Sequence, residues 1–152
     1  MLREGEEVLI VGIGSTVYPS LRAAERLEAE GMHVAVINSR FLKPLDEELV
    51  CDWAKRTGRV LTVEENVLLG GFGSAVLEVL QERGFSSVRV RRLGIPDLFV
   101  EHGPQSLLRA KYGIDEQGIF RAVKEMMEEE RSLSIRPNQT KASIKRLFLN
   151  FK

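Results

Sequence analysis

The sequence predicts a single α/β domain in which a mostly parallel sheet of four to five strands lies between two layers of helices. Segments with the pattern of strands begin at Val8, His33, Arg59 and Ser87, and amphipathic segments separate them. Such an alternation implies right-handed strand–helix–strand crossovers and therefore a parallel sheet. The composition, with 43% apolar and 29% charged residues in 152, is ordinary for one soluble globular domain.

The first expected strand, residues 8–12, is a continuous apolar run, as in a parallel strand that is covered on both faces. The fourth alternates valine with arginine, which predicts an edge strand with one face in water. The expected strands are residues 8–12, 33–37, 59–63 and 87–92.

Helices are expected between the strands and after the last one. Each of the first four stops at a glycine, the usual residue after a helix. Asp115 is expected to cap the last helix, and Ser15 or Thr16 the first. The expected helices run from Val17 to Gly31, Leu45 to Gly58, Phe72 to Gly84, Pro104 to Gly113, and Asp115 through Met127.

The charge distribution divides the chain into a domain, residues 1–130, and a basic tail, residues 131–152. The domain has 16 basic and 22 acidic residues, a net charge of −6, whereas the tail has six basic residues and no acid. The domain therefore has no electrostatic footprint for nucleic acid. The tail is expected either to be mobile or docked on its own domain, or to form a membrane-surface or partner-binding helix, with its partner unknown.

No apolar run is long enough to span a membrane, and no signal peptide precedes the first strand, so a cytoplasmic location is expected. The single Cys51 excludes an internal disulfide and is expected to be a buried, inert thiol. His33 and His102 lack further ligands at metal-binding spacing, so no metal site is expected.

The segment Thr62–Asn66, with the glycine-rich Gly70–Ser74 behind it, is the best candidate site. A strand, a polar loop and a helix N-terminus form the corner where α/β domains bind ligands. Adjacent Glu64 and Glu65 point to opposite sides of an extended strand, so they are not a ready acid/base pair. One of them is expected to neutralise the helix N-terminus. The alternative is a catalytic carboxylate presented to a neighbouring domain.

Two other segments offer weaker candidates. Gly12 and Gly14, followed by Ser15, resemble half of a dinucleotide-binding loop, but Val17 replaces its third glycine and no acid follows the second strand. A tight turn is favoured over a weak anion site there. His102, in a turn, has a side chain suited to proton transfer, although hydrogen bonding within the turn is the commoner role.

Taken together, eight short motifs resemble the C-terminal domain of the 1-deoxy-D-xylulose-5-phosphate synthase family, within the transketolase superfamily. They occur in the family's order over residues 2–128. They are Leu2–Gly5, Gly12–Ser15, Arg40–Asp46, Thr62–Asn66, Gly70–Val76, Gly94–Asp97, Glu101–Gly103 and Tyr112–Asp115.

The resemblance implies details of the sheet. Strand 8–12 would lie between strands 33–37 and 59–63. An antiparallel edge strand would precede Val8, cut short here by the start of the chain. The topological switch point would then lie between the Gly12 loop and the Glu64–Gly73 loop.

The resemblance also implies a function for the complete protein. This family uses thiamine diphosphate and Mg²⁺ to condense pyruvate with glyceraldehyde 3-phosphate, with loss of CO₂, at the start of isoprenoid precursor synthesis. None of its cofactor-binding or catalytic motifs has a counterpart in these 152 residues, so no catalytic, cofactor-binding or metal-binding residue is expected in this chain.

The chain is therefore expected to be the synthase's third domain, silent alone, which contacts the other domains and a second chain of a homodimer. The alternatives are a split transketolase-like subunit or non-enzymatic module with an anion-binding crevice at Gly12 and Gly70, and a 2-oxoacid dehydrogenase β-subunit domain. The switch-point and interface candidates are Gly12, Gly14, Ser15, Glu64, Glu65, Gly70, Gly71, Gly73 and His102.

Overall fold

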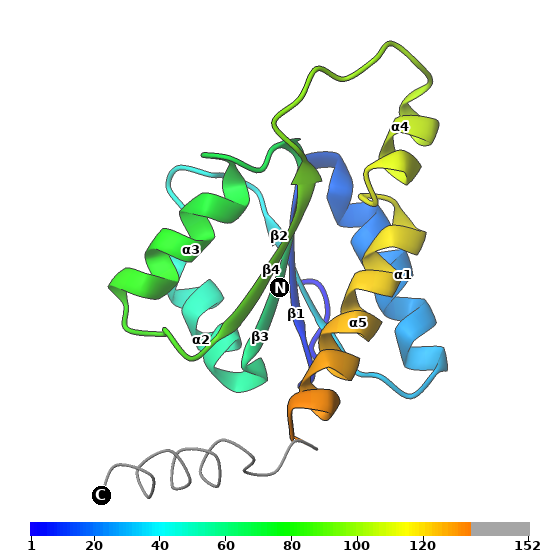
Figure 1. Ribbon diagram of the computed structural model, residues 1–152. Coiled ribbons are helices and arrows are strands. Elements are labelled where there is room, and N and C mark those ends of the chain that lie inside the picture. Colours follow the sequence, from blue (N-terminus) through cyan, green and yellow to red (C-terminus); the bar gives the residue numbers. More distant parts are fainter. Residues whose placement is uncertain (135–152) are drawn as a thin grey trace, which may run out of the picture.

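A four-stranded parallel sheet forms the centre of the protein in the computed structural model, which describes residues 1–134 (Figure 1). The strand order is β2-β1-β3-β4, so the order implied by the family resemblance is confirmed. Neighbouring strands all pair in parallel. The strands are β1 (Leu9–Ile13), β2 (Ala35–Ser39), β3 (Arg59–Val67) and β4 (Arg89–Ile95).

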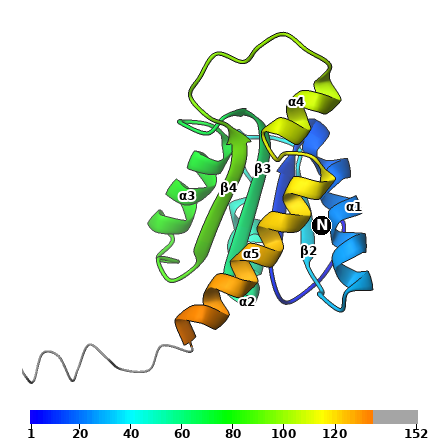
Figure 2. The ribbon, with the colours of Figure 1, turned by 45° about the vertical axis from the view of Figure 1, so that its right-hand side comes forward.

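Helices cover both faces of the sheet, which confirms the three-layer architecture. Figures 1 and 2 show α1 and α5 side by side on one face and α2 and α3 on the other. The short α4 stands beyond the carboxyl ends of the strands. The helices are α1 (Val17–Ala29), α2 (Glu47–Thr57), α3 (Phe72–Glu82), α4 (Gln105–Lys111) and α5 (Glu116–Ser134), and a single 3₁₀ turn, η1 (Gly14–Thr16), precedes α1.

The alternation of side chains along β1 divides the core into two layers. Leu9 and Val11 pack with residues of α2 and α3, whereas Val8 and Ile10 pack with residues of α1 and α5. All four side chains are buried. Burial on both faces explains why this strand is a continuous apolar run rather than an alternating one.

β4 lies at the edge of the sheet, as predicted, but the prediction that one of its faces is in water is wrong. Arg91 pairs with Glu125 at 2.7 Å and with Glu129 at 2.6 Å, and Arg89 also pairs with Glu129. These acids belong to α5, which lies over that face. The arginines are half-buried because their stems pack under the helix while their guanidinium groups reach its carboxylates.

The opposite edge shows part of the expected antiparallel strand. Arg3 forms an isolated antiparallel bridge with Val36 of β2, and its main-chain N–H and carbonyl both bond Val36. The pairing is confined to this bridge in the described residues.

Most predicted helix ends are confirmed. Asp115 accepts a hydrogen bond from the Gly118 N–H at 2.9 Å, and Gly58 ends α2 with a left-handed backbone. The prediction that Ser15 or Thr16 caps α1 is wrong: Ser15 is exposed, and the Thr16 side chain makes no cap bond because it points into the sheet.

α5 continues to Ser134, past the expected domain boundary at residue 130. The expected linker after Pro137 and the apolar stripe of the tail lie outside the described residues. None of the helices within residues 1–134 combines the length and apolar character needed to cross a bilayer.

Replacing Met126 by alanine should destabilise the protein by about 2–5 kcal/mol, since this fully buried α5 side chain would leave a cavity against the sheet. Urea unfolding followed by circular dichroism measures the change. The control is Leu77→Ala in α3, where the side chain is 37% exposed, and a loss below about 1 kcal/mol is expected there. Equal losses in the two variants would contradict the proposed role of α5 as part of the core.

Candidate functional site at the carboxyl edge of the sheet

Glu64 is a fully buried carboxylate that closes the N-terminus of α3. Its Oε2 accepts the Phe72 N–H at 2.7 Å, and its Oε1 accepts the Gly73 N–H at 2.8 Å. These are two of the N–H groups that a helix cannot bond internally, and they carry the positive end of its dipole. The prediction that one of the two glutamates neutralises this helix end is confirmed.

The glycines behind Glu64 make room for it. A Cβ on Gly71 would overlap the Val67 carbonyl oxygen and the Glu64 carboxylate. A Cβ on Gly73 would lie 2.6 Å from the Thr62 hydroxyl and 2.8 Å from Arg92 Cδ. Both glycines are therefore required by close packing, and Gly70 has a left-handed backbone with φ of 71°.

Arg92 of β4 fixes the loop between β3 and α3. Its Nη1 donates to the Leu68 carbonyl at 2.8 Å and to the Ser74 hydroxyl at 2.9 Å. The Gly70 N–H donates to the same hydroxyl at 3.2 Å. The candidate loop is thus held from both sides, by Glu64 at the helix end and by Arg92 from the neighbouring strand.

Glu65 points away from Glu64, as the alternation of a strand predicts. Its Oε1 lies 2.6 Å from both Nε and Nη2 of Arg109, on α4. This ion pair is about a quarter to a third exposed, so it is worth at most about 1 kcal/mol. The two carboxylates therefore hold two different helices rather than one substrate.

The Gly12–Ser15 turn lies beside Glu64 because Gly12 pairs with Val63 in the sheet. The Thr16 hydroxyl is 2.8 Å from the Val63 carbonyl oxygen, to which it donates, and it accepts the Ile13 N–H at 3.2 Å. Thr16 is buried, whereas Gly14 and Ser15 are exposed. The structure thus brings the Gly12 and Glu64 loops together at the switch point, and Thr16 bridges them.

His102 is not part of this cluster. It is an exposed residue in the segment between β4 and α4, and no hydrogen bond or ion pair joins it to either glutamate. Cys51 is buried in α2, and burial raises the pKa of its thiol, as expected for an inert cysteine.

The described residues do not fit thiamine diphosphate or Mg²⁺. The α3 N–H groups that could bind a diphosphate already bond Glu64, and the carboxylate there would repel an anion. Glu65, a possible metal ligand, is paired with Arg109. Within residues 1–134 no three histidine, cysteine or acidic side chains are close enough together to hold a metal ion.

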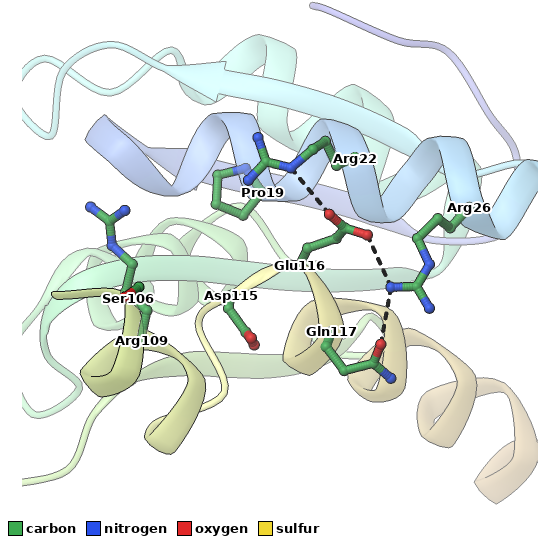
Figure 3. A pocket seen from close by; sticks show the side chains of 8 residues that line it. All are labelled: Pro19, Arg22, Arg26, Ser106, Arg109, Asp115, Glu116 and Gln117. Carbon is green, nitrogen blue, oxygen red and sulfur yellow. Dashed lines mark hydrogen bonds and ion pairs between the residues drawn. The ribbon is translucent and has the colours of Figure 1, made fainter. Parts of the chain in front are cut away.

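A hollow of about 390 Å³ lies between α1, α4 and α5 (Figure 3). Three arginines line it, but each is paired: Arg22 and Arg26 bond the two oxygens of Glu116 at 3.1 and 2.9 Å, and Arg109 bonds Glu65. Figure 3 shows the Glu116 carboxylate between the two α1 arginines. The arginines fix α1 to α5 and leave no unpaired cation for an anionic ligand.

Exposed apolar side chains gather at the carboxyl edge of the sheet. Of the twelve large apolar residues exposed in residues 1–134, nine follow the ends of β1 to β4 or lie on α4. Phe99 is fully exposed, and Leu69 is 75% exposed. Exposed apolar side chains that gather in one region are typical of surfaces that bind other proteins. We call it the apolar rim: Tyr18, Phe41, Leu42, Val67, Leu69, Leu98, Phe99, Val100 and Leu107.

Comparison with known proteins identifies the family of this chain. Residues 1–119 match the family described as "Transketolase, C-terminal domain". The chain belongs to the transketolase C-terminal domain family. This membership confirms the fold class and the family expected from the eight sequence motifs.

Several relatives carry the name of one enzyme. The chain is 57% identical over 122 residues to "1-deoxy-D-xylulose-5-phosphate synthase 1" of Geobacter sulfurreducens, covering 80% of this chain and 19% of the relative. It is 54% identical over 128 residues to the enzyme of the same name from Geobacter metallireducens, covering 84% and 20%. The chain therefore spans about a fifth of the length of the curated relatives it matches.

A solved structure also shares this fold at substantial identity. It is titled "Split gene transketolase, inactive beta4 tetramer", is 42% identical, and superposes with a TM-score of 0.75. The match covers 82% of this chain and 40% of that one.

Arg92 and Arg109, which hold the Thr62–Ser74 corner and its Glu65, were not predicted from the sequence. Arg92 could have been found from the predicted sheet, because it pairs with Thr62 in the β3–β4 register and faces the same side as Glu64. Arg109 could not, since its contact with Glu65 depends on where α4 lies. The rim was also missed, because single apolar residues in separate loops have no pattern in the sequence.

Replacing Glu64 by alanine should destabilise the domain by about 3 kcal/mol, because two buried N–H groups lose a charged acceptor. Glu64→Gln keeps one acceptor oxygen and should lose about half as much. The matched control is Glu65→Ala, for which a loss of about 1 kcal/mol or less is expected. Urea unfolding of the three variants measures these differences, and equal losses at positions 64 and 65 would refute this account.

Glu116 should contribute to the pH dependence of stability. Hydrogen bonds from Arg26 hold the pKa of its carboxyl below the ordinary value of 4.5. A lowered folded-state pKa means that the contribution is present above the ordinary value and is lost as the pH falls through the folded one. Glu116→Gln should therefore lose less stability on acidification than the native chain. Midpoints of urea unfolding, measured as the pH is lowered through and below 4.5, test this expectation. The exposed Glu25→Gln is the control. A native-like acid response in Glu116→Gln would contradict the assignment.

Proposed function

We propose that this chain is the C-terminal domain of a thiamine-diphosphate-dependent 1-deoxy-D-xylulose-5-phosphate synthase. In this proposal the complete protein condenses pyruvate with glyceraldehyde 3-phosphate, releases CO₂ and works in the cytoplasm. The observation that carries the proposal is the identity of 54–57% to synthases of that name over most of the chain. The resemblance of the eight motifs supports the same enzyme.

The domain's part in that enzyme is contact with the other domains and with a second chain of a homodimer. The carboxyl edge supports this role because it combines an exposed apolar rim with loops that are internally fixed. The fixed loop is the one between β3 and α3, beside the exposed Val67 and Leu69, and a rigid loop loses little conformational entropy when a partner covers it. Glu64, Gly70, Gly71 and Gly73 shape the β3–α3 loop, and Glu65 holds α4 through Arg109. Gly12, Gly14, Ser15 and His102 lie in loops at the same edge.

The isolated domain is proposed to be catalytically silent. Its two candidate carboxylates serve as a helix cap and as an ion-pair partner, and both roles need the carboxylates where they are. The anion-binding alternative at Gly12 and Gly70 loses support from the same geometry, since Glu64 already occupies the helix end.

A domain exchange tests the proposal. The Geobacter sulfurreducens synthase, with its own C-terminal domain replaced by this chain, should release CO₂ from pyruvate when glyceraldehyde 3-phosphate, thiamine diphosphate and Mg²⁺ are present. The isolated chain should release none. In the chimera, Phe99→Ser should weaken assembly by about tenfold, if Phe99 is an anchor of the interface.

Leu77→Ser is the matched control for Phe99→Ser, because Leu77 is an exposed apolar residue of α3 away from the rim. It should leave assembly unchanged. The proposal would be contradicted by a folded chimera that releases no CO₂ from pyruvate, or by release of CO₂ by the isolated chain.

A separately encoded subunit is the second candidate, favoured by the likeness to a split-gene transketolase. In the first candidate, domains of the same enzyme cover the rim. In the second, the rim is covered by a separate chain or by a second copy of this chain. Sedimentation of the isolated chain distinguishes them: a stable tetramer that Phe99→Ser dissociates would favour the separate subunit.

A further inference from the structure

The loops at the carboxyl edge carry three unpaired charges. Five lysine, arginine, aspartate or glutamate residues lie in the loops that join β2, β3 and β4 to the helices after them. Asp46 caps α2, and Glu101 is paired with a lysine of α4. Arg40, Lys43 and Asp97 are exposed, and within residues 1–134 none of them forms an ion pair or a side-chain hydrogen bond. These three charges are therefore available to a partner.

The unpaired charges divide the apolar rim into a basic half and an acidic half. Arg40 and Lys43 lie beside Phe41 in the loop after β2, and Asp97 lies near Phe99 in the loop after β4. β2 and β4 are the two edge strands of the sheet. Because neighbouring strands are about 4.8 Å apart, these edge strands lie roughly 7 Å on either side of a line between β1 and β3. Opposite charges thus lie at equal distances from the middle of the rim.

The two halves also lie toward opposite faces of the sheet. β2 leads into α2, which covers one face together with α3 (Figures 1 and 2). β4 leads into α4, which borders the hollow between α1 and α5 on the other face. A rotation of 180° about an axis that runs parallel to the strands, between β1 and β3, exchanges both the edges and the faces. It brings the β2–α2 loop of one copy over the β4–α4 loop of another.

The inner residues of the rim obey the same symmetry. Tyr18, at the start of α1 after β1, is 71% exposed, and Leu69, between β3 and α3, is 75% exposed. The rotation exchanges β1 with β3 and the α1 face with the α3 face, so it places Tyr18 of one copy opposite Leu69 of the other. The height of the edge is also complementary, since Figure 1 shows α4 and the segment before it standing beyond the strand ends, while the β2–α2 loop stays close to them.

We propose that the apolar rim binds the rim of a second copy of this chain about a two-fold axis between β1 and β3. Arg40 and Lys43 of each copy face Asp97 of the other, and Phe41 packs near Phe99. Such a contact uses the same patch on both copies, as two-fold interfaces do. The inference rests on the proposed function, in which the rim is an interface, and it names the partner: in the complete enzyme, the same domain of the second chain.

Sedimentation equilibrium of the chain, at concentrations up to about 1 mM, tests this contact because even a millimolar dimer is populated there. The native chain should form a dimer. Asp97→Lys and Arg40→Asp/Lys43→Asp should each weaken it at least about tenfold, because every charge pair across the axis becomes repulsive.

Reversing both sides of the pair should restore the dimer. The variant Arg40→Asp/Lys43→Asp/Asp97→Lys should associate within about threefold of the native chain, since opposite charges again face each other. For the same reason, a 1:1 mixture of the two separately reversed variants should form a mixed dimer. Only a second copy of the chain as the partner gives this rescue.

The matched controls reverse exposed charges on helices. Glu78→Lys on α3 corresponds to Asp97→Lys, and Lys55→Asp/Arg121→Asp on α2 and α5 corresponds to the double reversal at the rim. Both should associate like the native chain.

A native chain that stays monomeric at about 1 mM would overturn the proposal. So would a dimer that the charge reversals leave unchanged, or that their combination fails to restore. If Phe99→Ser nevertheless weakens that dimer, or weakens assembly of the chimeric synthase, the rim is an interface with another surface, and the proposed function stands without this inference.

Discussion

The Glu64 carboxylate at the N-terminus of α3 is the interaction on which the carboxyl edge depends. A buried charge is costly unless it is hydrogen-bonded, and Glu64 meets that condition through two main-chain N–H groups with unbalanced positive partial charge. The same bonds fix the angle at which α3 leaves β3. This arrangement requires glycine at positions 71 and 73, because a larger residue at either position would displace the helix from the carboxylate.

The corner that is best placed for ligand binding is therefore filled by the protein itself. Parallel α/β sheets usually bind ligands where the crossovers change direction, in the gap between two adjacent loops. Here Thr16 bonds across that gap and Glu64 takes the helix end, so the loops support each other instead of a cofactor. The fixed β3–α3 loop carries the exposed Leu69, which suits this corner to contact with another protein surface.

The sequence was sufficient for the sheet order, the layers and the direction of the two glutamates, because each depends on local periodicity or on a family pattern. It failed where position depends on distant packing. The valine–arginine alternation of β4 predicted a strand face exposed to water. Instead, α5 lies over that face, and its Glu125 and Glu129 pair with Arg91. Thr16 was expected to cap its helix, but the neighbouring β3 carbonyl competes for its hydroxyl. Neither the α5 glutamates nor the Val63 carbonyl is close in sequence to the residue that it contacts, so a short stretch of sequence does not reveal these contacts.

The arginine–glutamate pairs between β4 and α5 have a consequence for how the domain can assemble. An unpaired edge strand is a template onto which a second sheet can add, and charged side chains beside it oppose that growth. Arg89 and Arg91 are fixed along this edge by α5, so a second β4 brought alongside would meet the same cations. Association by strand addition is thereby disfavoured, and copies of the domain can lie close together without merging their sheets.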